Sequence, residues 1–176
     1  MRMFRLLPLL LLMPLLLAGA RERGVVLELD REHYSLTARD LDHQVDGPTL
    51  RVALGSPAHP TPSGEYRVYT AVRNPGWQPG PVARALGAEP EPPSDRGPLG
   101  VGKIPFAKDG RIALHGGAHP LLLGKRVSLG CVRALDADFL ALLDWLEARG
   151  ALQIERPAAG GEIRQVFRRP TRVVVR

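Results

Sequence analysis

Short runs of strand-forming residues, separated by turns rich in glycine and proline, constrain the fold of this chain more than any other feature. The 176 residues include 19 Gly and 17 Pro, and both residue types interrupt regular structure and mark turns. Runs with alternating apolar and polar residues, or with clustered β-branched residues, predict strands. The predicted strands are 24–30, 33–40, 49–55, 65–72, 111–116, 151–155 and 171–176. The pattern predicts a mainly β, β-sandwich-like fold or a small barrel-like pair of sheets.

One principal helix is predicted over about 136–149. Apolar residues recur there at helical spacing, with Asp136 expected as the N-cap and Gly150 as the end signal. The expected buried face comprises Phe139, Leu142, Leu143 and Leu146. The proline-rich segment 74–100 shows little periodicity, and we expect a long surface loop that is either a lid, a binding loop or a decoration.

The first twenty residues carry the pattern of a secretory signal peptide. Arg2 and Arg5 precede a leucine-rich run, and Ala18-Gly19-Ala20 fits a cleavage site. An uncleaved membrane anchor is the alternative, but the apolar run is shorter than the roughly 20 residues that cross a bilayer. We therefore predict a signal peptide over 1–20, a single domain over 21–176 without stable membrane insertion, and a location in the periplasm or cell wall.

The charge balance of the chain is basic. The formal net charge is +6, or +4 once Arg2 and Arg5 are removed with the predicted leader. Such a charge suits an anionic partner or polymer, although general solubility would explain the same excess. The chain has no recognisable nucleic-acid-binding motif, so we expect no nucleic acid partner.

Cys131 is the only cysteine in the chain, so an exported protein of this sequence has no internal disulfide. Such a residue is a free reactive thiol, an intermolecular disulfide partner or an inert buried side chain. A reactive thiol needs a neighbouring base to become a thiolate near neutral pH, and histidine commonly supplies it. The candidate bases are His33, His43, His59, His115 and His119.

His115 has the most favourable position among these histidines. It ends a predicted apolar strand, and the two glycines after it, Gly116 and Gly117, permit a sharp turn. Cys131 follows sixteen residues after His115. A strand, a loop and a returning segment would bring the two side chains together.

The residues around Cys131 also suit acyl chemistry. Gly130 leaves space for a substrate next to the thiol, and the backbone N–H groups of 129–131 could form an oxyanion hole. Arg133 could hold a carboxylate in a two-pronged contact. These features predict a cysteine nucleophile acting on an acyl group.

Four motifs together resemble the YkuD-type L,D-transpeptidase catalytic domains of bacterial cell walls. The motifs are HGG (115–117), SLGCVR (128–133), GSPAHPTPSGEYRV (55–68) and NPGW (74–77). The family pattern has His-Gly followed, at a similar spacing, by Ser/Thr-His-Gly-Cys, an aliphatic residue and Arg or Asn. The similarity covers roughly 25–155. It implies a mainly β catalytic domain that needs no metal or organic cofactor.

The resemblance also implies roles for the residues at matching positions. Cys131 is implied as the nucleophile and His115 as its base, with the carbonyl of Gly116 orienting the imidazole as the third member of a triad. The implied substrate-binding residues are Arg133, Ser128, Gly130 and Trp77. Trp77 would line the substrate groove or, alternatively, pin a loop to the core.

The implied reaction is acyl transfer on peptidoglycan stem peptides, for cell wall cross-linking or remodelling. Cys131 would attack the bond between the penultimate L-centre and D-Ala of a stem tetrapeptide, D-Ala would leave, and an amine of a neighbouring stem would resolve the thioester. A wall-linked protein is another acceptor to consider. Carbapenem-type β-lactams would acylate Cys131.

Leu129 departs from the family pattern, because many members have histidine there. Leucine cannot shuttle a proton, so the acceptor remains open. With water as acceptor, the protein would be an L,D-carboxypeptidase or an amidase that releases wall-attached protein. A non-catalytic wall-binding module is a further alternative. A zinc site of His115, His119 and Cys131 is another, although HGGAHP does not suit the helix that this spacing would need.

Overall fold

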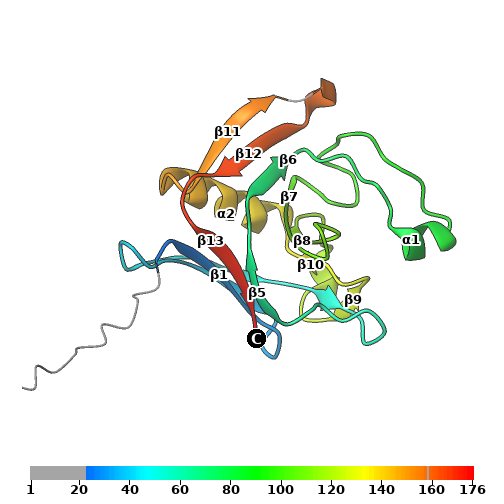
Figure 1. Cartoon of the computed structure of the whole chain (residues 1–176). Helices are drawn as coiled ribbons and strands as arrows, with labels where there is room; N and C mark the ends of the chain where they lie inside the picture. Colours follow the sequence, from blue (N-terminus) through cyan, green and yellow to red (C-terminus); the bar gives the residue numbers. More distant parts are fainter. Residues whose placement is uncertain (1–22, 158) are drawn as a thin grey trace, which may run out of the picture.

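The computed structural model describes residues 23–157 and 159–176, and the predicted signal peptide lies outside them. Strands account for most of the regular structure in these residues, and helices are few (Figure 1). The mainly β prediction is therefore confirmed. Across the same residues, no helix combines the length and the apolar character needed to span a membrane.

The first sheet contains five strands in the order β3-β2-β1-β13-β5. They are β1 (Val25–Asp30), β2 (Ser35–Asp40), β3 (Val45–Arg51), β5 (Gly64–Arg67) and β13 (Thr171–Val175). β1 and β13 run parallel, with Val25 opposite Thr171 and Leu29 opposite Val175. Two strands from opposite ends of the described chain thus lie side by side within this sheet (Figure 1).

The second sheet contains six strands in the order β10-β8-β7-β6-β12-β11. They are β6 (Thr70–Arg73), β7 (Gly102–Ala107), β8 (Ile112–His115), β10 (Val132–Arg133), β11 (Leu152–Pro157) and β12 (Ile163–Phe167). β8 and β10 run parallel, whereas the other neighbours are antiparallel. A small third sheet pairs β4 (Leu54–Gly55) with β9 (Arg126–Ser128). Short 3-10 turns cover Pro120–Leu122 and Ala159–Gly161.

Two predicted strands are divided in the structure. The run 65–72 forms β5 in the first sheet and β6 in the second. At the break, the Val68 N–H donates to the Thr171 carbonyl at 3.0 Å, and a chain that changes sheets in this way forms a corner of a sandwich. The run 49–55 likewise divides into β3 and β4. β7 and β12 are strands that the sequence patterns do not predict.

Helix α2 (Asp136–Ala148) packs against β3, β7 and β11. Its predicted apolar face is confirmed, because Phe139, Leu142, Leu143 and Leu146 are completely buried. These side chains join a continuous apolar cluster with residues of both large sheets. Burial of each such side chain contributes about 2 kcal/mol, so this cluster fixes the helix against the sheets.

The predicted N-cap of this helix is wrong. Leu135 occupies the N-cap position without a side-chain cap, and Asp136 is the first helical residue. The Oδ1 atom of Asp136 accepts instead from the backbone N–H groups of Val101, at 3.0 Å, and Gly117, at 2.8 Å. The carboxylate therefore joins the helix to the turn after β8.

The segment 74–100 is a long excursion, as expected, and it contains some regular structure. Helix α1 (Pro81–Ala85) lies within it. The backbones of Trp77 and Glu91 exchange two hydrogen bonds of 2.9 Å, and Trp77 is half-buried. The excursion ends beside the turn after β8, because a Cβ added at Gly100 would lie 2.2 Å from the Gly117 nitrogen.

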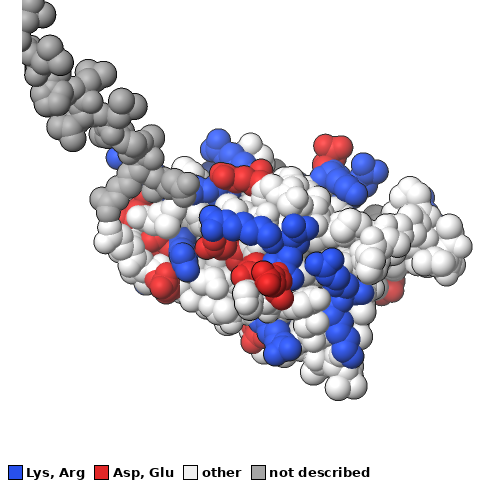
Figure 2. Space-filling view, turned by 90° about the horizontal axis from the view of Figure 1, so that it is seen from below, with Lys and Arg blue, Asp and Glu red and all other residues white. Residues whose placement is uncertain are grey.

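Charged side chains of both signs share the face of the molecule shown in Figure 2. The ion pairs of the first sheet include Arg176 with Glu28 at 2.7 Å and Arg172 with Glu65 at 3.0 Å. Each pair has one exposed partner, Arg176 or Glu65, and one partner that is more buried, and ion pairs open to solvent contribute about 1 kcal/mol or less each. The face in Figure 2 is thus of mixed charge, without an uninterrupted basic surface.

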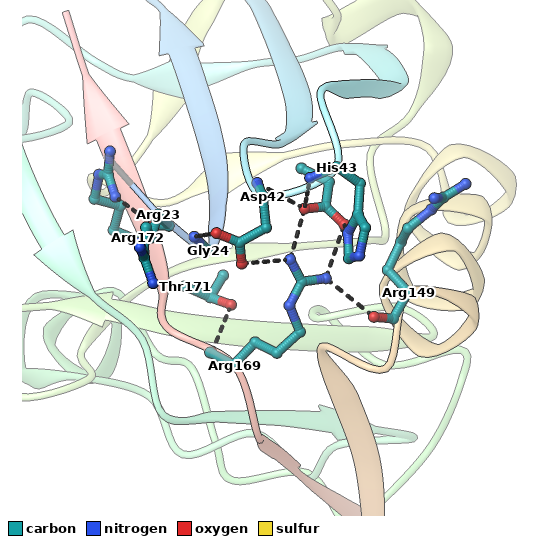
Figure 3. A network of polar contacts seen from close by, with 9 residues as sticks. Arg23, Gly24, Asp42, His43, Arg149, Arg169, Thr171 and Arg172 are labelled. Carbon is teal, nitrogen blue, oxygen red and sulfur yellow. Dashed lines mark hydrogen bonds and ion pairs between the residues drawn. The ribbon is translucent and has the colours of Figure 1, made fainter. Parts of the chain in front are cut away.

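A denser group of charges, here called the Arg169 cluster, joins three segments of the chain (Figure 3). The Arg169 guanidinium donates to Asp40 at 2.6 and 2.8 Å, to Asp42 at 2.9 Å and to the Arg149 carbonyl at 3.0 Å. The Nδ1 atom of His43 lies 2.8 Å from the Asp40 carboxylate. The cluster ties the turn after β2 to the link before β13 and to the end of α2.

Candidate active site

The parallel pairing of β8 with β10 brings two predicted site segments together. Arg133 lies opposite His115, and Val132 lies opposite Leu114. Cys131 directly precedes β10, and its Sγ atom lies 3.8 Å from the carbonyl oxygen of Arg111, just before β8. The predicted strand, loop and returning segment are therefore present, and they place the His115 and Cys131 segments side by side.

His115 is buried, and its ring is held in one orientation. Its Nδ1 atom lies 2.7 Å from the carbonyl oxygen of Gly116. Because a carbonyl oxygen only accepts, Nδ1 carries the hydrogen, which leaves Nε2 of the neutral ring free to accept a proton. Burial lowers the pKa of His115 to about 4, and the charge of Arg133 acts in the same direction. His115 is therefore neutral at pH 7.

Cys131 is half-buried and also neutral at rest. Burial raises the pKa of its thiol, while the Ala113 backbone and the charges of Arg133 and Lys103 partly oppose this effect. The site thus holds a thiol and an imidazole, not a thiolate and an imidazolium. A base must remove the thiol proton before the sulfur can act as a strong nucleophile.

Two hydroxyl groups fix the backbone of the Cys131 loop. The Ser128 hydroxyl accepts from the Gly130 N–H at 3.1 Å and donates to the Cys131 carbonyl at 2.6 Å. The Thr61 hydroxyl donates to the Gly130 carbonyl at 3.0 Å and accepts from the Gly55 N–H at 2.9 Å. Thr61 and Ser128 are both buried, so these bonds are shielded from water.

Gly130 is favoured chiefly by its backbone conformation. Its φ of 116° disfavours residues with a side chain, and an added Cβ would lie 2.7 Å from the Ile112 side chain. Its N–H is bonded to Ser128. Of the backbone N–H groups predicted for an oxyanion hole, that of Gly130 is therefore already engaged.

Arg133 combines a fixed backbone with an unsatisfied side-chain donor. Its backbone exchanges hydrogen bonds of 2.8 and 2.9 Å with Ala53. Its Nε atom is buried and has no hydrogen-bond partner among the residues that the structure describes. A buried donor of this kind is costly unless an acceptor arrives, which is consistent with a site for an anionic group.

The remaining predicted positions differ in their surroundings. Leu129 is 41% exposed next to Cys131, and Val127 on β9 and Leu121 in the 3-10 turn are also exposed apolar residues. His119 accepts a hydrogen bond from the Leu121 N–H at 3.3 Å and begins a 3-10 turn. Within 23–157 and 159–176, no three His, Cys, Asp or Glu residues are grouped to hold a metal ion. The geometry thus gives no support to the zinc alternative.

Sequence reasoning missed two contributors to this region. Thr61 belongs to the TPSG motif used for the resemblance, but its hydrogen bond to Gly130 spans 69 residues and has no local signal. For Asp136 the sequence predicts a helix N-cap, because an acidic residue at a helix start suggests one; its carboxylate contacts Val101 and Gly117 instead. A partner outside the helix could be inferred only from the fold.

The comparisons with known proteins concern the family and the fold of the chain. The family model for the L,D-transpeptidase catalytic domain (YkuD) matches residues 25–175. A comparison with curated proteins finds no match to this chain.

Several solved structures resemble the chain in fold. L,D-transpeptidase 3 from Mycobacterium tuberculosis, in complex with a faropenem-derived adduct, has a TM-score of 0.55 at 19% identity, covering 87% of this chain and 60% of its own. An L,D-transpeptidase from Mycobacterium tuberculosis H37Rv has a TM-score of 0.54 at 19% identity, with coverages of 87% and 57%. The catalytic domain of the E. faecium L,D-transpeptidase, acylated by ertapenem, has a TM-score of 0.53 at 17% identity, with coverages of 87% and 95%. The chain thus spans nearly all of the last domain, but only about three fifths of the two mycobacterial chains.

Proposed function

Because this chain belongs to the L,D-transpeptidase catalytic domain family, we propose that it is an exported cysteine acyltransferase acting on peptidoglycan stem peptides. The observation that carries the proposal is the 2.7 Å contact between His115 Nδ1 and the Gly116 carbonyl, on a strand paired with the segment that follows Cys131. This contact presents the unprotonated Nε2 of a neutral imidazole as a base. Cys131 is the proposed nucleophile, and Gly116 holds the base in position.

In the first half-reaction, Nε2 takes the thiol proton as Sγ bonds to the carbonyl carbon of the stem peptide. The carbonyl oxygen becomes an oxyanion, for which the Cys131 N–H is the proposed donor. Collapse of this intermediate breaks the bond to D-Ala, and the departing amine takes the proton from Nε2. The product is a thioester on Cys131.

In the second half-reaction, an acceptor amine attacks the thioester carbon. His115 takes a proton from this amine and returns it to the departing sulfur, which restores the neutral pair. Because burial favours the neutral forms of both side chains, proton transfer accompanies each attack and no thiolate accumulates beforehand.

Substrate binding is proposed to centre on Arg133. Its buried Nε lacks a partner within the described residues, so a substrate carboxylate would supply the missing acceptor. Ser128 and Gly130 shape the floor of the site through the backbone. For Trp77 the two proposed roles remain, lining the substrate groove or pinning a loop to the core, because its backbone bonds to Glu91 lie within the excursion itself.

The location is proposed from the leader and the family together. The signal peptide over 1–20 would deliver a single domain over 21–176 to the periplasm or cell wall, where the family's substrates are found. Reaction there would cross-link or remodel the wall, with a stem amine or a wall-linked protein amine as the acceptor.

The test uses residues 21–176 incubated with purified disaccharide-tetrapeptide muropeptides, next to a Cys131→Ala variant. Mass spectrometry should show cross-linked dimers and free D-Ala with the wild type and neither with the variant. Tripeptide and D-Ala without dimers would instead identify water as the acceptor, making the protein an L,D-carboxypeptidase. If no product depends on Cys131, the stem-tetrapeptide proposal fails, and release of wall-attached protein becomes the next activity to assay.

A further inference from the structure

A single peptide group connects the candidate base to a carboxylate on another element. The Gly116 carbonyl faces His115 Nδ1 at 2.7 Å, and the N–H of the same peptide, contributed by Gly117, donates to Asp136 Oδ1 at 2.8 Å. The described chain has no cis peptide bonds, so the carbonyl and the N–H of this group point in opposite directions. One end of the group is therefore held by Asp136 while the other end orients His115.

Asp136 fits this position closely. A second N–H, from Val101, also donates to Oδ1, at 3.0 Å. A Cβ added at Gly100 or at Gly116 would lie 2.2 Å from the same oxygen, so glycine is needed on both sides of the carboxylate. The first turn of α2 also stabilises a negative charge through the helix dipole. These contacts hold the Asp136 carboxylate against the back of the turn that carries the Gly116 carbonyl.

We propose that Asp136 is a positioning residue for the reaction, acting on His115 through the Gly116–Gly117 peptide. Hydrogen bonds in series polarise one another, so a carboxylate at the N–H end makes the Gly116 carbonyl a stronger acceptor. A stronger acceptor stabilises the protonated imidazole that forms during each half-reaction. The inference rests on the proposed role of His115 and assigns it a negatively charged support from another element.

The charges around His115 show why a nearby carboxylate would assist its protonation. Arg133 on β10 and Lys103 on β7 both disfavour the imidazolium, whereas Asp136 on α2 favours it. Cys131 is uncharged at rest and therefore offers no counter-charge before it reacts. Asp136 thus offsets part of the opposition that two cations and burial present to proton uptake.

The test compares Asp136→Asn with Asp138→Asn in the purified protein. Asparagine retains an oxygen acceptor for the two N–H groups but removes the charge, whereas D138N removes a charge from the same helical turn without touching the peptide. The first measurement is the pKa of the His115 ring, determined by an NMR titration of the protein with the Cys131→Ala substitution. We expect D136N to lower this pKa by about one unit, equivalent to tenfold in proton affinity, and D138N to leave it unchanged.

The second measurement is the rate at which a carbapenem acylates Cys131, read by intact mass across a pH series. In D136N, the rate at neutral pH should fall by roughly two- to fivefold, because general-base catalysis follows only part of a change in base strength, and its decline in acid should begin at lower pH. An unchanged His115 titration in D136N, or an equal shift in D138N, would overturn the inference. If D136N does not fold, Asp136→Ser, a shorter neutral acceptor, undergoes the same titration. Failure of the wild type to acylate would instead count against the proposed function, since the NMR titration does not depend on turnover.

Discussion

Two polar regions of this protein each contain a buried ionisable side chain, Asp40 in one and His115 in the other, and the two regions favour opposite charge states. In the Arg169 cluster (Figure 3), the guanidinium of Arg169 holds the pKa of Asp40 well below its usual range, and Asp40 in turn raises the pKa of Arg169. In the candidate site, burial lowers the pKa of His115 and raises that of Cys131. Charge is therefore favoured in the cluster and disfavoured at the site.

The difference lies in the partners that each region supplies. Every charge in the cluster meets an opposite charge within 3 Å, so ion pairing offsets the loss of hydration. The site supplies His115 with the Gly116 carbonyl, the two cations Arg133 and Lys103, and the single opposing charge of Asp136. The cluster is suited to holding segments together, and the site is suited to creating charge only while the reaction proceeds.

The largest expected effect is on the site. Replacing the base with His115→Gln should slow acylation of Cys131 by a carbapenem about 1000-fold, because proton removal by a positioned base is worth that order of magnitude. Stopped-flow fluorescence or timed mass spectrometry would measure the rate. His119→Gln is the matched control and should retain the wild-type rate; an H115Q variant as fast as H119Q would remove His115 from the mechanism.

The next largest effect is expected on stability, when the ion pairs of the Arg169 cluster are removed. Arg169→Met should lower the free energy of unfolding by about 3 kcal/mol, because the buried Asp40 charge loses its partner. Urea denaturation would measure the change, with Arg176→Met as the control for an exposed ion pair. The acylation rate per folded molecule should not change. Little loss of stability would show that His43 and backbone donors alone can support the Asp40 charge.

The pH dependence of stability should separate the two regions. His115 has a pKa of 6.5 in the unfolded state and about 4 in the folded state. Between these two pH values the unfolded state therefore binds a proton at His115 that the folded state does not bind. The free energy of unfolding should therefore fall as pH drops from 6.5 to 4, by at most about 1.4 kcal/mol per pH unit. H115Q should flatten this window.

Asp40 also lowers the free energy of unfolding as the pH falls, but over a lower pH range than His115. Its pKa is lowered from 3.8 in the folded state, so its stabilising contribution is complete above that pH and declines as the pH falls further. R169M should weaken this second decline but not the first. Equal effects of H115Q and R169M in both windows would contradict the separation of the two regions.

The smallest expected effect concerns the support of the Cys131 loop. The Gly130 carbonyl and the Cys131 N–H belong to one peptide, so Thr61→Val should misdirect the proposed oxyanion donor and slow acylation about tenfold. It should also lower stability by about 1 kcal/mol through lost hydrogen bonds. Alkylation of Cys131 by iodoacetamide, which forms no oxyanion, should be unaffected, and Thr61→Ser should restore acylation. A loss of alkylation equal to that of acylation would indicate a disturbed thiol instead.

Local patterns in the sequence predict the elements whose burial follows a simple period. The face of α2 is the clearest example, since Phe139 and Leu142 are buried as their spacing predicts. β12 is missed because the residue it buries completely is polar: Gln165 donates to Glu147 at 2.6 Å. β7 is missed because it contains Pro105, next to a register shift, where proline is tolerated in a strand.

The candidate site likewise contains residues that local patterns identify and contacts that only the fold creates. Cys131 and His115 can be singled out from residue chemistry and motif spacing, because each lies in a short recognisable stretch. The contacts of Thr61 and Asp136 join residues 69 and 19 positions apart, and nothing local encodes them. The run of strand-forming residues through 65–72 likewise conceals the corner, since it is the sheet partners that change there and not the type of residue.

The parallel pair of β1 and β13 also determines when the fold can be completed. β13 lies between β1 and β5, so the first sheet stays divided until residues 171–175 are available. For a chain that emerges N-terminus first from a secretion pore, this is a contact between its earliest and latest strands, and such long-range closure is slow. Under the export proposed above, the first sheet would therefore assemble only after the chain has crossed the membrane.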